Sequence, residues 1–141
     1  MTIDQAQDTI IDEFSLFDDW MDKYDLLIEK GKDVPEIDEK HKNNDHLIEG
    51  CQSKVWLYPE YKEGKIYFKA DSDAIITRGI AGLLIKVLSG HTPDEILDSD
   101  LYFIDKIGLS QNLSPTRSNG LVAMVRQMKM YALAFKAKQK S

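Results

Sequence analysis

The sequence contains a single cysteine, Cys51, among 141 residues, and several features that define whole protein classes are absent. One cysteine cannot form an internal disulfide or supply a thiolate cluster for a metal. No apolar run reaches membrane-spanning length, and residues 1–5 lack the basic and apolar regions of a signal peptide. Positive charge is scarce as well, since 18 Lys and Arg face 24 Asp and Glu, a net charge of −6. We therefore expect a protein of the reducing cytoplasm that binds neither nucleic acid nor a membrane.

The composition favours one compact domain over residues 1–141. Hydrophobic residues make up 43% of the chain and charged residues 30%, as in a domain with one core. No internal repeat, low-complexity tract or second domain is visible. The oligomeric state is left open between a monomer and a homodimer.

The first third of the chain predicts two helices and a polar connection. Thr2 and Gln5 have the spacing of a capping box, and apolar residues then recur at helical spacing to about Leu16. A second helix is expected to begin at the acidic pair 18–19 and to end at Gly31. Residues 31–45 predict a long surface connection.

A β-hairpin is predicted next, followed by a buried helix. Alternating apolar residues indicate strands over 53–61 and 65–70, with a turn at Glu63-Gly64. Residues 71–73 (Asp-Ser-Asp) are typical of a helix N-cap, and the apolar helix after them contains Gly79 and Gly82. We expect these glycines to pack closely against the sheet.

The C-terminal half predicts three further helices. Residues 92–95 combine an N-cap, a proline and a capping-box acid. A short helix is expected within 100–107, a loop over 108–113, and a last helix from Ser114-Pro115. Helices, a hairpin and more helices, without a βαβ repeat, predict an α+β fold: a small antiparallel sheet with helices packed on one face.

Two interpretations of Cys51 follow from its surroundings. It comes directly after Gly50 and shortly before the first predicted strand, so it can be a reactive thiol on a loop attached to rigid structure. It can equally be a small buried hydrophobe, the usual fate of a free cysteine. The three histidines, His41, His46 and His91, lack the spacing of a metal motif and are expected to be solvated.

Three segments resemble the SufE family of sulfur-acceptor proteins. They are Ile48-Glu49-Gly50-Cys51-Gln52-Ser53-Lys54-Val55-Trp56, Ala70-Asp71-Ser72-Asp73-Ala74 with Gly79 following, and Leu113-Ser114-Pro115-Thr116-Arg117-Ser118-Asn119-Gly120-Leu121. They occur in the family's order and span most of the chain. The resemblance implies a fold similar to SufE and to IscU-like scaffold proteins.

The resemblance also implies a function. SufE-like proteins receive persulfide sulfur from a SufS-like cysteine desulfurase, stimulate that enzyme, and pass the sulfur to a SufBCD-like iron–sulfur scaffold. Cys51 would then be the persulfide acceptor. The pyridoxal phosphate cofactor would belong to the desulfurase, so the chain needs no cofactor or metal of its own and has no independent enzymatic turnover.

Other motif residues are candidates for supporting roles. Arg117 and Asp73 are expected to help the thiol site or the contact with the desulfurase, together with Gly50 and Gln52 in the Cys51 loop. A structural interpretation, in which residues 71–73 cap a helix and Arg117 merely begins one, stays open. Two other functions also stay open: a binding module that regulates a desulfurase without carrying sulfur, and a single-cysteine thiol enzyme.

Overall fold

A two-stranded antiparallel hairpin forms the sheet in the computed structural model, which describes residues 1–49 and 53–139. Strand β1 (Val55–Lys62) pairs with β2 (Lys65–Ser72), from Val55 opposite Ser72 to Lys62 opposite Lys65. Glu63 and Gly64 both have positive φ, 51° and 81°, which matches a two-residue type I′ turn. Both predicted strands are therefore confirmed, and each lies within two residues of its expected bounds.

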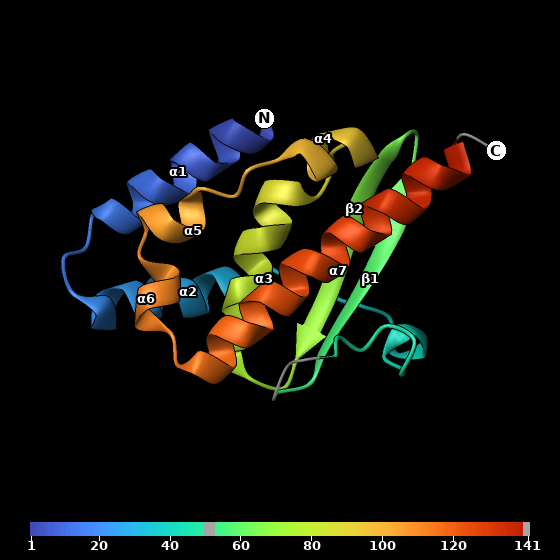
Figure 1. The fold of residues 1–141 in the computed structure, drawn as a ribbon. Coiled ribbons are helices and arrows are strands. Elements are labelled where there is room, and N and C mark those ends of the chain that lie inside the picture. Colours follow the sequence, from blue (N-terminus) through green and yellow to red (C-terminus); the bar gives the residue numbers. More distant parts are fainter. Residues whose placement is uncertain (50–52, 140–141) are drawn as a thin grey trace.

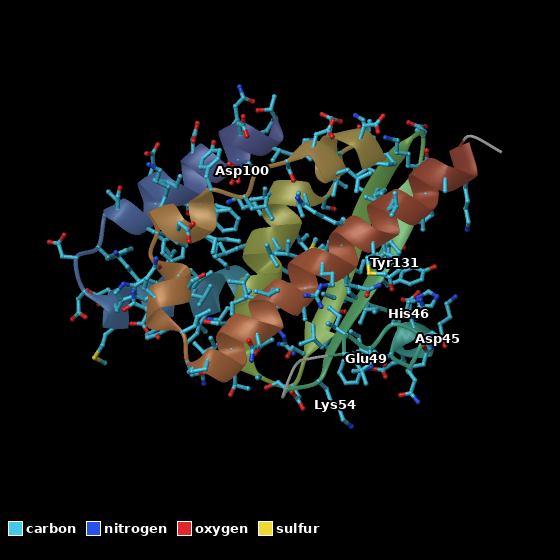
Figure 2. All side chains as sticks on the ribbon, viewed as in Figure 1. Asp45, His46, Glu49, Lys54, Asp100 and Tyr131 are labelled. Atoms are coloured by element: carbon cyan, nitrogen blue, oxygen red, sulfur yellow. The ribbon has the colours of Figure 1, made fainter. Side chains whose placement is uncertain are left out.

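One face of the hairpin packs against helices, as predicted (Figure 1). Val55, Leu57, Ile66 and Phe68 alternate along the strands and are buried in the core. The central helix α3 (Ile75–Leu88) contacts β2, and the long helix α7 (Pro115–Gln139) crosses the hairpin. Tyr131 of α7 donates a hydrogen bond to the carbonyl of Leu57 in β1 at 3.4 Å, and it lies over the hairpin in Figure 2.

Five shorter helices complete the core. They are α1 (Ile3–Ser15), α2 (Trp20–Lys32), α4 (Pro93–Asp98), α5 (Phe103–Lys106) and α6 (Leu109–Asn112). The predicted capping boxes at the starts of α1 and α4 are both present, and Asp19 caps α2. Residues 108–113, expected to form a loop, contain the single turn of α6, so that expectation is wrong.

Gly79 and Gly82 pack against α2 and not against the sheet, which corrects the sequence-based expectation. A Cβ at Gly79 would lie 2.3 Å from the carbonyl oxygen of Leu27, and one at Gly82 would lie 2.6 Å from that of Lys30. The two helices approach so closely that only hydrogen fits at these positions. Such a helix–helix contact leaves no periodic signal that distinguishes it from a helix–sheet contact.

The connection after α2 is more ordered than its polar composition suggests. It contains a 3-10 turn, η1 (Glu39–His41), and its Ile37 is buried. The ring of His41 stacks on Tyr58 of β1, with centroids 3.7 Å apart, and His46 meets the same ring edge-on. These histidines are half-buried on the outer face of the hairpin, so they are packed against Tyr58 as well as solvated, which the sequence pattern does not predict.

Backbone pairing covers part of the outer edge of each strand. Leu47 forms a bridge with Trp56 on the β1 side, and His91 forms one with Ile66 on the β2 side. Covered edges prevent pairing with other chains. In the described ranges, no helix has both the length and the apolarity needed to cross a membrane.

Candidate functional site: the two ends of the Cys51 loop

The segments on both sides of Cys51 in the chain are anchored. Gly50, Cys51 and Gln52 lie outside the described residues, but their flanks are described. Ile48 N–H donates to the carbonyl of Val55 at 2.8 Å, and Leu57 N–H donates to that of His46 at 2.9 Å. Ile48 and Val55 are buried in the core. Residues 46–48 therefore run antiparallel to the start of β1, and residues 49–54 connect two fixed points.

A second attachment joins the loop to the turn between β2 and α3. Asp73 Oδ1 accepts a hydrogen bond from Lys54 N–H at 3.1 Å, and Asp73 N–H donates to the Lys54 carbonyl at 3.3 Å. Figure 2 shows Glu49 and Lys54, on the two sides of the loop, at the end of the hairpin where β1 begins. The two bonds restrain a backbone position only three residues after Cys51.

Helix α3 does not begin with the predicted side-chain cap. Its N-cap residue is Ala74, whose methyl group cannot accept a hydrogen bond. Ser72 Oγ instead accepts from Ala74 N–H at 3.2 Å, while the Asp73 carboxylate bonds to Lys54. The interpretation of residues 71–73 as a helix cap is therefore wrong, because two of these side chains bind elsewhere.

Asp71 lies at the centre of an ion cluster on the outer side of this turn. Arg78 Nη2 donates to Asp71 Oδ1 at 2.7 Å, and Lys42 Nζ lies 2.5 Å from Asp71 Oδ2. Burial raises the pKa of the Asp71 carboxyl, but the hydrogen bonds from Lys42 and from Ser72 N–H, with the charges of Lys42 and Arg78, outweigh burial and lower that pKa below its ordinary value. The carboxylate is therefore ionised at neutral pH.

Arg117 lies in the first turn of α7, at an exposed position. Helical spacing puts it on the same face as Leu121 and Met124, which are buried, so it extends that face beyond the core. Across residues 1–49 and 53–139, its guanidinium has no hydrogen-bond or ion-pair partner. A cation at a helix N-terminus opposes the helix dipole, so the local structure gives no reason for an arginine here.

The structure thus assembles some of the sequence-based candidates and leaves others apart. Asp73 contacts Lys54, on the flank of Cys51, and the first turn of α7 lies at the same edge of the molecule in Figure 1 as the β2–α3 turn.

Sequence patterns do not single out Arg78 or Lys42. The available signal is that Arg78 is one of only two charged residues, with Lys86, in the apolar sequence of α3, and it lies on the side nearer to Asp71 and Asp73. Among the described residues, no group of three or more His, Cys, Asp or Glu side chains could hold a metal.

Comparisons with known proteins identify the family. The family model for SufE, the Fe-S metabolism associated domain, matches residues 8–132. The chain belongs to the SufE family. It is 38% identical over 130 residues to an uncharacterised SufE-like protein of Rhizobium meliloti, covering 89% of this chain and 93% of the relative. It is 42% identical over 127 residues to another from Rhizobium etli, covering 86% of each.

Two further matches widen the comparison. The SufE-family chain is 39% identical over 117 residues to the Arabidopsis thaliana protein named SufE-like protein 1, chloroplastic/mitochondrial. That match covers 82% of this chain but 32% of the plant protein. A solution structure of a hypothetical protein from Thermus thermophilus aligns with a TM-score of 0.75 at 20% identity, covering 92% of this chain and 94% of that one. The last likeness shows a shared fold.

Proposed function

We propose that this SufE-family chain accepts sulfur on Cys51 from a pyridoxal phosphate-dependent cysteine desulfurase, stimulates that enzyme, and passes the sulfur to an iron–sulfur scaffold. Membership of a family associated with Fe-S metabolism supports a role in that metabolism. The observation that carries the proposal is the placement of the chain's one thiol between two anchored loop ends, 46–48 and 54–57. Anchored flanks allow the residues between them to meet a partner while the core stays intact.

The transfer step needs one thiol. The Cys51 thiolate attacks the outer sulfur of the donor persulfide, the bond between the two donor sulfurs breaks, and the donor cysteine leaves as a thiolate. The products are a persulfide on Cys51 and the free donor thiolate, with no net oxidation or reduction. The same exchange in the next step moves the sulfur onward, so a second cysteine is unnecessary.

The proposal assigns the difficult chemistry to the partner. The desulfurase contributes the pyridoxal phosphate that cleaves the carbon–sulfur bond of cysteine, and this chain contributes the acceptor and the contacts that position it. In this view the chain acts in the cytoplasm as an accessory protein, with a SufS-like donor and a SufBCD-like recipient.

Alanine release by a SufS-like desulfurase tests the proposal. With cysteine as substrate and limiting reductant, the wild-type chain should increase the steady rate, because it removes the enzyme's persulfide and frees it for the next turnover. Cys51→Ala should bind but fail to increase the rate. Equal stimulation by Cys51→Ala would instead support a binding module that regulates the enzyme without carrying sulfur. No effect of either protein would refute both.

A further inference from the structure

Arg78 contacts two successive residues of the turn that precedes its own helix. Its Nη2 atom donates to Asp71 Oδ1 at 2.7 Å and to the backbone carbonyl of Ser72 at 2.8 Å. Arg78 N–H also donates to the Ala74 carbonyl at 2.9 Å, in the first turn of α3. One side chain therefore fixes the end of β2 relative to the start of α3.

The same turn carries the attachment to the Cys51 loop. Ser72, whose carbonyl Arg78 contacts, is followed directly by Asp73, which exchanges two hydrogen bonds with the backbone of Lys54. The positions of the Asp73 carboxylate and N–H depend on the path of the chain through Ser72. A continuous set of contacts thus leads from Arg78 through the turn to Lys54.

Lys42 gives the cluster a second cation from a different segment. Its Nζ contacts Asp71 Oδ2 and lies 3.1 Å from Glu39 Oε1, so it attaches residues 39–42 to the outer face of the hairpin. If Arg78 is removed, Asp71 keeps a partner and stays ionised. Among the described residues no other side chain donates to the Ser72 carbonyl, so we expect Arg78 to act mainly on the path of the turn.

We propose that Arg78 is a positioning residue for Lys54, three residues after Cys51: it fixes the β2–α3 turn so that Asp73 stays paired with Lys54, and it thereby sets how often Lys54 leaves this attachment. This inference rests on the proposed function for its biological meaning, because a positioned loop matters if Cys51 reacts. Its structural content does not depend on sulfur transfer.

Hydrogen exchange of the Lys54 amide, measured by NMR, tests the inference. Arg78→Ala should speed this exchange severalfold, up to about tenfold, relative to amides within α1, and Arg78→Lys should restore part of the protection because an ammonium can still reach a carbonyl. The matched control is Lys136→Ala, which breaks the 2.7 Å ion pair between Lys136 and Asp94, away from the turn. The control should leave the exchange rate of the Lys54 amide unchanged. Arg78→Met, which preserves the length of the side chain, replaces Arg78→Ala if the latter does not fold.

Two results would overturn the inference. Unchanged Lys54 exchange in Arg78→Ala or Arg78→Met would show that the turn stays in place without the guanidinium. A uniform increase across Lys54 and α1 would show a general loss of stability. Sulfur loading on Cys51 is measured in parallel: if wild type and variants all fail to load while Lys54 exchange responds, the proposed function fails and the positioning role stands.

Discussion

Removal of the Asp73 carboxylate should loosen the attachment of Lys54, on the C-terminal side of Cys51, without unfolding the protein. Asp73→Ala deletes the 3.1 Å bond from Lys54 N–H to Oδ1 and keeps the backbone bond from Asp73 N–H to the Lys54 carbonyl. A hydrogen bond contributes roughly 0.5–1.5 kcal/mol net. Asp73 and Lys54 are both exposed, so water can replace the lost acceptor, and the lower part of that range applies. About 0.5–1 kcal/mol corresponds to a roughly two- to fivefold larger population in which Lys54 is detached from Asp73.

The assay is exchange of the Lys54 amide together with thermal unfolding. Exchange of the Lys54 amide should accelerate roughly two- to fivefold, while the free energy of unfolding changes by no more than about 1 kcal/mol. Asp94→Ala is the matched control, because Asp94 is also an exposed aspartate with one bonding partner, Lys136. Lys54 exchange that is equal in wild type and Asp73→Ala would refute the claim that this carboxylate attaches the loop.

Three further predictions concern other parts of the structure. Gly79→Ala should destabilise the protein by about 1–3 kcal/mol in chemical denaturation, because its Cβ would overlap the Leu27 carbonyl; an unchanged midpoint would contradict the close α2–α3 contact. Arg117→Ala should fold normally but slow sulfur acceptance from a desulfurase, whereas Arg126→Ala on the same helix should not; normal transfer kinetics in Arg117→Ala would assign Arg117 a structural role. The pKa of Asp71 is lowered in the folded protein from its ordinary value of 3.8. The stability that the Asp71 carboxylate contributes is therefore present above pH 3.8 and is lost as the pH falls through the lower pKa of the folded state. An NMR titration midpoint at or above 3.8 for Asp71 would disprove this.

Local signals in the sequence predict local structure well. The capping boxes at Thr2 and Thr92 and the Glu63-Gly64 turn depend on residues three or fewer positions apart, and all three are present in the structure. The SufE motifs also predict the family, which the comparisons confirm. Each of these features is encoded within a short segment, so no knowledge of the tertiary contacts is needed.

Contacts between distant segments explain what sequence patterns miss. Asp73 is of a residue type that often caps helices, but its carboxylate bonds to Lys54, 19 residues earlier in the chain. His41 has a polar neighbourhood in the sequence, yet its ring stacks on Tyr58. In both cases a partner across the fold competes with the local interaction, and periodicity carries no information about that partner. The role of Cys51 itself stays a prediction.

The most direct test of the proposed role is the intact mass of the chain after incubation with a SufS-like desulfurase and cysteine. The mass should increase by that of one sulfur atom, located by peptide mapping to the segment that contains Cys51, and the increase should be reversed by a reductant and absent in Cys51→Ala. An unchanged mass under conditions in which the desulfurase carries its own persulfide would contradict the proposed role.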